Sequence, residues 1–478
     1  MLSNPSSIFL IPLFLLHLTF FTTPTISSPL HLHPIAAGPP PQRLSPHTSA
    51  SGCTPLTFLV RATALNTVFL HPPDPLSASS ILSFLHSSYS NSTGPLTNGT
   101  HLIGRGNRVF PLHATYCRPL FHPPGLPPRT LQVLVHGATY NQTIWSGLGL
   151  GHNDYDWMGM ARARGYHVLA IDLLGHGGSS FSSSSKQYDG VTEIQPPLQS
   201  SVLHSLVRLL RHGPINAPRK GWRNPLPYRF PRIVYVGHGY GSAGLVVSLV
   251  RRYPRDLDGV FQTSPIERSG FNKSVVRNLV PARMVDGSER FGHLPLTYLA
   301  FRDGKEREKA FYAGFYDTAS IPGEDFRGQG TVTVGEAVYY HAMETREEEE
   351  GVARGYRGPV MVVSGERDAL FCASQSGRDD DRNERGSCKK KLVEMGKRVW
   401  PDAKKVEVYV ARETGHTWMM HYSAKITMWR IHNWLDGVFR RKMKDEEMVD
   451  GGKDGKLGKL VMQDEAWDGY DRIELDGE

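Results

Sequence analysis

The chain has 478 residues, which is long enough for one large domain with insertions or for two domains. Its 48 glycines and 34 prolines, together with abundant serine, imply many loops. The formal net charge of +8 is spread along the sequence, and the densest basic clusters, at residues 389–391 and 440–444, carry no interleaved aromatic residues. We therefore expect a solvated basic surface and no nucleic-acid partner.

The N-terminus carries an apolar run, residues 8–21, followed by small and polar residues. This run has the length of the hydrophobic region of a secretory signal peptide and is short for a bilayer span, and Pro12 and His17 weaken it further as an anchor. The segment before it lacks the usual Lys or Arg. We predict a signal peptide over residues 1–27, removed after Ser27, and a secreted chain without a stable membrane span. An uncleaved anchor is the alternative.

Two further features agree with secretion. Sequons for N-glycosylation occur at Asn91, Asn98, Asn141 and Asn272. The four cysteines are even in number, and proximity pairs Cys53 with Cys117 and Cys372 with Cys388 among three possible connectivities. Reduced thiols are the alternative. No Cys-x-x-Cys motif or His cluster indicates a metal, and we expect no cofactor.

The chain after the signal divides into an irregular start and a regular alternation. Residues 28–50 are rich in Pro, His and Ser and predict a flexible leader. Segments 54–64 and 107–116 have strand character and predict an antiparallel start. From residue 130 onward, apolar strands alternate with helical stretches, which is the pattern of βαβ units and a parallel sheet. The predicted strands cover 131–137, 166–172, 232–239, 257–265, 358–368 and 404–416, and the predicted helices cover 154–165, 193–213, 242–254 and 423–439.

The strand signal stops between residues 265 and 358. This segment holds short helical pieces, several aromatic residues and an acidic run at 347–350 that fits a solvated helix face. An insertion of this kind between sheet strands predicts a cap over the strand ends. The folded domain is expected to span residues 51–440. A charged, glycine-rich tail over 441–478 is predicted to be disordered.

Three motifs that carry chemistry follow one another along the chain. HGATYN at 136–141 follows a buried strand, DLLGHGGS at 172–179 forms a glycine-rich turn, and VGHGYGS at 236–242 has glycines on both sides of a strand-to-helix turn. Downstream, Asp368 and His416 each lie just past a predicted strand. This order of motifs resembles the α/β-hydrolase fold family.

The resemblance covers residues 130–440 and implies a mostly parallel sheet with helices on both faces and an inserted cap. Relatives of this type hydrolyse esters and related bonds through Ser-His-Asp. The resemblance places the nucleophile at position 239, with His416 as the base and Asp368 as the acid. An Asp that faces a His fixes its tautomer and stabilises the imidazolium.

The resemblance also indicates which backbone groups would face developing negative charge. A helix N-terminus after the sharp turn favours such charge. The oxyanion hole is expected from the amides near Ala138 or Thr139 and of Tyr240. His136 and Gly137 are expected to border the bound ligand, a small hydrophobic or ester-like molecule.

Glycine at position 239 departs from the pattern. Gly239 has no side chain, so no acyl-enzyme can form on it. Loss of the nucleophile alone costs on the order of a millionfold in turnover. Ser242 is the nearest replacement, but a frame centred on it puts bulky Tyr240 where a small residue is needed. Ser242 would also lie in the first helical turn rather than at the tip, so we predict impaired covalent catalysis.

Three other interpretations remain open at the level of sequence. A water activated by the His416–Asp368 pair could replace the serine, which would give a residual hydrolase. Gly239 could be an allelic change, because Ser and Gly codons can differ by one base. Finally, the pocket could bind a small hydrophobic or ester-like ligand without turnover.

Overall fold

The structure is a computed structural model, and the compact unit Thr48–Glu478 carries the fold. The structure describes residues 52–90, 97–105, 108–123, 125–127, 129–150, 153–180, 187–217, 221–265, 273–285, 289–342, 351–372 and 385–439. The predicted features that lie outside the described residues are the signal peptide at 1–27, the tail at 441–478, the leader at 28–50, the acidic run at 347–350 and the sequons at Asn91 and Asn272.

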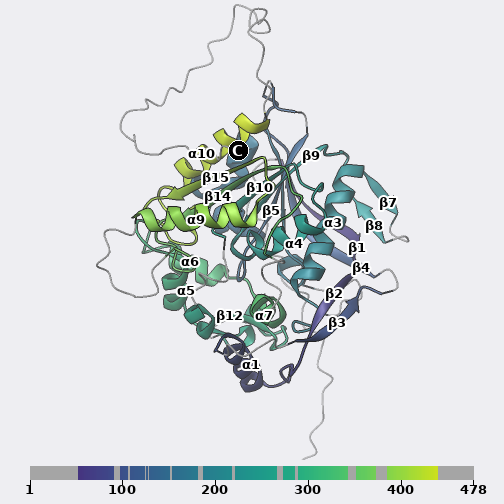
Figure 1. Ribbon diagram of the computed structural model, residues 1–478, viewed down its shortest axis with the longest axis vertical. Helices are drawn as coiled ribbons and strands as arrows, with labels where there is room; N and C mark the ends of the chain where they lie inside the picture. The colour runs from purple at the N-terminus through teal and green to yellow at the C-terminus, as the bar shows by residue number, and fades with distance from the viewer. Residues whose placement is uncertain are drawn as a thin grey trace, which may run out of the picture. The chain divides into compact units, whose positions relative to one another are not determined.

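A ten-stranded sheet forms the centre of this unit, in the order β15-β14-β10-β9-β5-β6-β4-β1-β8-β7 (Figure 1). The strands are β1 Cys53–Arg61, β4 Val109–Cys117, β5 Thr130–Val135, β6 His167–Ile171, β7 Ile215–Ala217, β8 Trp222–Asn224, β9 Arg232–His238, β10 Gly259–Thr263, β14 Pro359–Gly365 and β15 Lys405–Ala411. The strands from β15 to β6 are parallel, and β4 and β1 continue the sheet antiparallel. The predicted α/β class with a mostly parallel sheet is confirmed.

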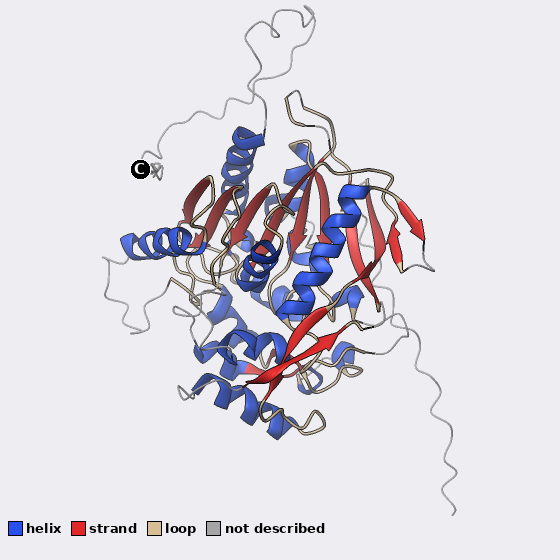
Figure 2. Cartoon of the chain, turned by 45° about the vertical axis from the view of Figure 1, so that its right-hand side comes forward, coloured by secondary structure: helices blue, strands red, loops and turns tan. Residues whose placement is uncertain are grey.

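Helices cover both faces of the sheet (Figure 2). One layer contains α3 (Pro196–His212), α4 (Gly244–Arg252) and α9 (Arg385–Val399), and the other contains α2 (Trp157–Ala163) and α10 (Ala424–Phe439). Within β9, Ile233 and Tyr235 pack into the core with α3 and α4, whereas Val234 and Val236 pack into the core with α2 and α10. Side chains that alternate between two cores are the mark of a strand buried on both faces, as parallel strands usually are.

The insertion between β10 and β14 contains strands as well as helices. Its elements are β11 (Leu279–Pro281), β12 (Tyr298–Phe301), α5 (Gly304–Phe311), α6 (Ile321–Gly328), β13 (Val332–Thr333) and α7 (Val334–Ala342). The expectation that no strand occurs between residues 265 and 358 is therefore wrong, because β11, β12 and β13 form a small antiparallel sheet. Strands of two to four residues are too short to show a period of two in the sequence.

The N-terminal part of the domain adds to this cap layer, which the sequence did not indicate. Helix α1 (Ala78–Ser90) lies near α7, below the central sheet in Figure 1. The Tyr89 hydroxyl donates a hydrogen bond to the Ala337 carbonyl of α7 (2.5 Å). Strands β2 (Ala64–Phe69) and β3 (Thr97–Ile103) form a separate antiparallel pair that leads into and out of α1.

Two disulfides tie the fold together, in the pairing that proximity favours. Cys53–Cys117 joins the paired ends of β1 and β4, and Cys372–Cys388 joins the segment after β14 to α9. All four sulfurs are bonded, so the reduced-thiol alternative does not fit the structure. None of the helices that the structure describes is long and apolar enough to cross a membrane.

Removal of the first disulfide is expected to cost more stability than removal of the second. The Cys53–Cys117 bond closes a loop with a sequence separation of 64, against 16 for Cys372–Cys388. Chain-entropy arguments give losses of about 4 and about 3 kcal/mol for Cys53→Ala/Cys117→Ala and Cys372→Ala/Cys388→Ala, respectively. Urea unfolding of the two double variants measures the difference. Alkylation of the denatured native chain should modify no thiol, and modified cysteines would contradict the pairing.

Candidate active site

The turn after β9 carries the feature on which the site is built. Strand β9 ends at His238, a short turn covers Gly239–Gly241, and α4 follows from Gly244. Gly239 has a φ of +51°, in the left-handed region that side chains other than glycine rarely adopt. A Cβ on Gly237 would lie 2.5 Å from the Gly241 carbonyl oxygen, so the flank must be glycine. The sequence therefore builds a sharp, strained elbow of the kind that projects a nucleophile.

The predicted base and acid lie directly beside this elbow. His416 Nδ1 is 2.9 Å from Asp368 Oδ2 and 3.1 Å from Oδ1, and both side chains are buried. The Asp368 carboxylate also accepts hydrogen bonds from the Ser364 hydroxyl (2.8 Å) and the Leu370 amide (2.9 Å). These hydrogen bonds fix the position of the carboxylate, which accepts the Nδ1–H of His416 and orients the imidazole ring.

The free side of His416 faces the missing side chain. An ideal Cβ on Gly239 would lie 3.2 Å from His416 Nε2 and 3.7 Å from Gly137 Cα. A serine hydroxyl one bond further out could reach Nε2 within hydrogen-bond distance. The structure thus brings together Gly239, His416 and Asp368, which lie 48 to 177 residues apart in the chain.

His238, the last residue of β9, adds a second buried imidazole. Its Nδ1 lies 2.9 Å from the Thr263 hydroxyl, and its ring centre is 5.0 Å from that of His416. Burial lowers the pKa of His238 well below its usual value, and the neighbouring His416 lowers this pKa further. His238 is therefore neutral at physiological pH and supports the turn from below.

Of the predicted oxyanion-hole residues, Thr139 has a backbone amide that already forms a hydrogen bond within the protein. Its amide donates to the Thr331 carbonyl of the cap (3.1 Å), and its carbonyl accepts from the Gly330 amide (2.8 Å). An amide that is already bonded to the cap is not available to a developing oxyanion. Ala138, which precedes Thr139, and Tyr240, which follows Gly239, remain beside the elbow.

The predicted ligand-binding role of His136 is also not supported by its contacts. His136 Nδ1 lies 2.9 Å from the Gly137 carbonyl oxygen, and Nε2 accepts from the Leu173 amide (3.0 Å). Burial, followed by the nearby His176, lowers the pKa of His136 to about 4. Both ring nitrogens are thus used to join two loops. Gly137 does border the elbow, since its Cα lies beside the Gly239 Cβ position.

A buried ion pair in the cap holds the oxyanion loop, and the sequence analysis missed it. Arg307 of α5 donates to both carboxylate oxygens of Asp325 of α6 (2.8 and 3.0 Å) and to the Thr139 hydroxyl (2.8 Å). Its guanidinium lies 4.6 Å from the Tyr140 ring centre and 4.7 Å from that of Phe311. Arg307 and Phe311 are four residues apart and share the inner face of α5, a spacing that could have marked Arg307 as buried.

The cap also covers His416, the predicted base. The Phe311 ring stacks on the His416 ring with centres 5.5 Å apart, and the Phe311 carbonyl accepts from the Thr417 amide (3.0 Å). On another side of the cap, His176 Nε2 lies 2.9 Å from Glu336 Oε2 of α7, and both side chains are buried. The cap thus contacts both His416 and the glycine-rich turn that contains His176.

No group of three or more His, Cys, Asp or Glu side chains that could hold a metal ion occurs in the part of the chain that the structure describes. The arrangement can bind, orient and deprotonate a group placed at the Gly239 Cβ position.

Loss of Arg307 is expected to destabilise the fold strongly. Arg307→Met leaves the Asp325 carboxylate buried without its partner, which costs about 3–5 kcal/mol. Lys309→Met on the same helix breaks the exposed pair with Glu306 and should change the unfolding free energy little, because solvent screens that pair. Urea unfolding of both variants tests this difference. Similar losses of unfolding free energy in the two variants would contradict the stabilising role of the Arg307–Asp325 pair.

Comparison with known proteins identifies the family of the chain. The sequence model of the alpha/beta hydrolase family matches residues 132–426, which is more than half of the chain. No curated protein matches the chain.

Solved structures that resemble the chain are distant in sequence. A thermophilic esterase from Thermogutta terrifontis has 15% identity and a TM-score of 0.40, with 69% of this chain and 95% of that chain covered. Est1E from Butyrivibrio proteoclasticus with bound ferulic acid has 13% identity and a TM-score of 0.38, with coverage of 69% and 96%. A membrane phospholipase A described as a bacterial virulence factor has 15% identity and a TM-score of 0.40, with coverage of 76% and 91%. On the match of its family model, the chain belongs to the alpha/beta hydrolase family.

Proposed function

We propose that this chain is a secreted alpha/beta hydrolase of the ester-hydrolase type in which covalent serine catalysis is impaired at Gly239. The observation that carries the proposal is the position of His416 Nε2, 3.2 Å from where a side chain of residue 239 would begin. The base is oriented by Asp368 and has no nucleophile to activate. The expected ligand is a small hydrophobic or ester-like molecule.

Without a hydroxymethyl group at residue 239, the acyl-enzyme of a serine hydrolase cannot form. In a serine hydrolase, the hydroxyl oxygen attacks the carbonyl carbon, the histidine takes the hydroxyl proton, and an acyl-enzyme forms. Loss of the nucleophile costs on the order of a millionfold in turnover, or roughly 8 kcal/mol of transition-state stabilisation. Binding and oxyanion stabilisation alone leave about 10³–10⁴-fold over water.

Neighbouring hydroxyl groups do not supply a replacement. The Ser242 hydroxyl is buried and donates to the Gly239 carbonyl (3.0 Å), which directs it back into the turn. The Ser264 hydroxyl donates to the His416 carbonyl rather than to its ring. The remaining nucleophile is a water beside Gly239 that His416 deprotonates. Hydrolysis by this route should be much slower than hydrolysis through a serine.

Secretion is supported by the apolar N-terminal run and by the two disulfides, which persist in oxidising compartments. The proposed organisation keeps the signal peptide at 1–27, the hydrolase domain at 51–440 and the cap at about 265–358. Glycosylation is proposed at the four sequons. The Asn141 carboxamide oxygen accepts hydrogen bonds from the Thr143 amide (2.9 Å) and hydroxyl (2.7 Å), which a glycan on this side chain would have to accommodate.

Restoring the serine is expected to restore covalent chemistry. Gly239→Ser should react with a fluorophosphonate probe, and its turnover of short-chain p-nitrophenyl esters should exceed that of the native chain by at least about 100-fold. The new side chain at φ +51° should lower the unfolding free energy by about 1–3 kcal/mol. Gly239→Ala is the matched control, because it adds the Cβ without the hydroxyl and should gain no activity.

Two results would overturn the proposal. Labelling of the native chain at Ser242 would mean that a displaced nucleophile acts. An inactive Gly239→Ser that still folds would mean that more than the hydroxyl is missing from the site.

Any turnover by the native chain is expected to depend on His416. His416→Ala should abolish it, whereas Ser242→Ala should leave it unchanged, because the Ser242 hydroxyl faces the backbone. Ester hydrolysis by the purified full chain, corrected for the buffer rate, measures both. Turnover that survives His416→Ala would place the activity outside this site. No turnover together with saturable binding of an apolar ester would favour a binding protein.

A further inference from the structure

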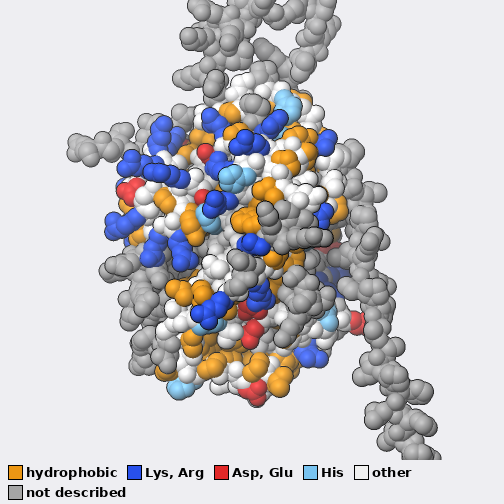
Figure 3. Space-filling view, turned by 90° about the vertical axis from the view of Figure 1, so that its right-hand side faces the viewer, with side chains coloured by type: hydrophobic (Ala, Val, Ile, Leu, Met, Phe, Trp, Pro, Cys, Tyr) orange, Lys and Arg blue, Asp and Glu red, His pale blue; other side chains and the backbone are white. Residues whose placement is uncertain are grey.

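Part of the positive charge of the chain lies close together at one end of the central sheet. Figure 3 shows Lys and Arg side chains clustered over the upper part of one face, with few acidic side chains among them. Six exposed side chains define what we call the basic face: Arg251, Arg252, Arg255, Arg354, Arg357 and Lys404. They come from the end of α4 and from the loops that precede β14 and β15.

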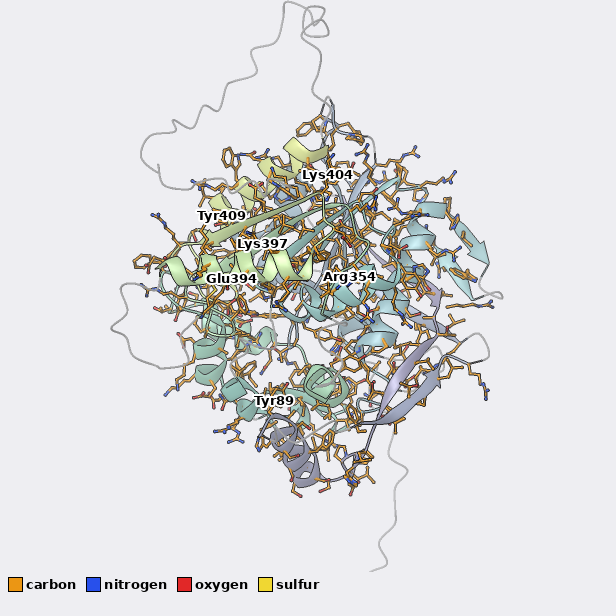
Figure 4. The ribbon with its side chains drawn as sticks, viewed as in Figure 1. Tyr89, Arg354, Glu394, Lys397, Lys404 and Tyr409 are labelled. Atoms are coloured by element: carbon orange, nitrogen blue, oxygen red, sulfur yellow. A yellow bond between two sulfur atoms is a disulfide. The ribbon has the colours of Figure 1, made fainter. Side chains whose placement is uncertain are left out.

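Backbone contacts bring these three segments together. The Cβ position of Gly355 lies 3.8 Å from Pro254, which connects the end of α4 to the loop before β14. The Lys404 amide donates to the Arg357 carbonyl (3.4 Å), which connects that loop to the loop before β15. The Ala353 amide donates to the Val399 carbonyl at the end of α9 (2.7 Å). Figure 4 shows Arg354, Lys397 and Lys404 around this helix end.

Three acidic side chains near the basic face have partners of their own. Asp256 pairs with His204 (2.7 Å), and Asp258 pairs with Arg211 (2.7 Å). Asp402 accepts from the Gly355 amide (2.7 Å). By contrast, none of the six basic side chains forms an ion pair with a carboxylate among the residues that the structure describes. The positive charge of the face is therefore left for a partner outside these residues.

The fold itself needs only part of this charge. Arg251 and Arg252 lie in the last turn of α4, where positive charge interacts favourably with the helix dipole. Arg255, Arg354, Arg357 and Lys404 lie beyond a helix end and gain nothing from that dipole. Like charges at this density repel one another, so the face carries a cost that binding of an anion would remove.

We propose that the basic face binds an acidic polysaccharide, whose repeated carboxylate or sulfate groups pair with the arginines. Five of the six side chains are arginine, whose planar guanidinium matches carboxylate and sulfate oxygens in a bidentate geometry. An extended polyanion can contact several segments at once, as this arrangement requires. A partner of this kind belongs to the extracellular space in which disulfides persist.

Other anionic partners fit the same face less well. Interfacial binding to lipid needs apolar side chains that enter the membrane, and none of the large hydrophobic residues exposed on the described chain lies within 251–258, 351–358 or 400–405. Nucleic-acid binding usually adds a helix or strand that enters a groove, or aromatic side chains for base stacking. The basic face consists of helix ends and loops, without such elements.

The face lies away from the candidate active site. Arg357 and Lys404 precede β14 and β15, whereas Asp368 and His416 follow these same strands. The two sites therefore lie at opposite ends of the parallel strands. A bound polysaccharide would hold the protein in place without competing with a ligand at Gly239.

The test measures binding of the full secreted chain to polygalacturonate and to heparin by biolayer interferometry at several salt concentrations. We expect Arg251→Gln/Arg252→Gln/Arg255→Gln to weaken binding to at least one of them about 10-fold or more. The slope of log affinity against log salt should become less negative by roughly two to three, about one unit for each lost charge. The matched control is Arg283→Gln/Arg302→Gln/Lys305→Gln, which removes three exposed charges from the cap and should change affinity less than about 3-fold.

Several outcomes would overturn the proposal. Equal losses in the two triple variants would mean that only net charge matters. Tighter binding to duplex DNA, or to vesicles of phosphatidylserine and phosphatidylcholine, would identify a different partner. Absence of binding to both polysaccharides at 50 mM salt would exclude acidic polysaccharides as the partner of the basic face. All substituted side chains are exposed, and an unchanged melting temperature checks that each variant is folded.

Discussion

The turn from β9 into α4 leaves no room for side chains on its flanks, and the site depends on this tight backbone packing. A Cβ on Gly237 would lie 2.5 Å from the Gly241 carbonyl oxygen, and one on Gly241 would lie 2.6 Å from the His136 carbonyl oxygen. These contacts fix residue 239 in a left-handed conformation opposite the His416 ring. Because backbone atoms set the geometry, the elbow keeps its shape even though Gly239 offers no nucleophile.

Two buried side-chain pairs join the cap to the rest of the site. Arg307–Asp325 reaches the loop of Thr139, and His176–Glu336 anchors α7 to the glycine-rich turn. A buried pair adds little net stability, whereas breaking it is costly, so such pairs favour one docking position over its neighbours. In the docking position that these pairs favour, Phe311 stacks on the His416 ring.

The sequence predicted those parts of the site that follow a strand directly. Asp368 and His416 could be found because parallel strands deliver their carboxyl ends to one edge, and Gly239 because glycines flank a strand-to-helix change. The role of Thr139 could not be found, since its partners Arg307 and Thr331 lie more than 160 residues away in a segment without clear periodicity. For the same reason, the short strands of the cap escaped detection.

The distribution of charge follows from the same topology. In a parallel sheet, helices end and new strands begin at one edge, so residues from the αβ connections meet there regardless of their distance in sequence. Arg252 and Lys404 are 152 residues apart, yet both occupy this edge. Strands of five to seven residues separate it from the opposite edge by about 20 Å. Residues at one edge therefore do not contact those at the other, and a substitution at residue 239 should leave the basic face unaffected.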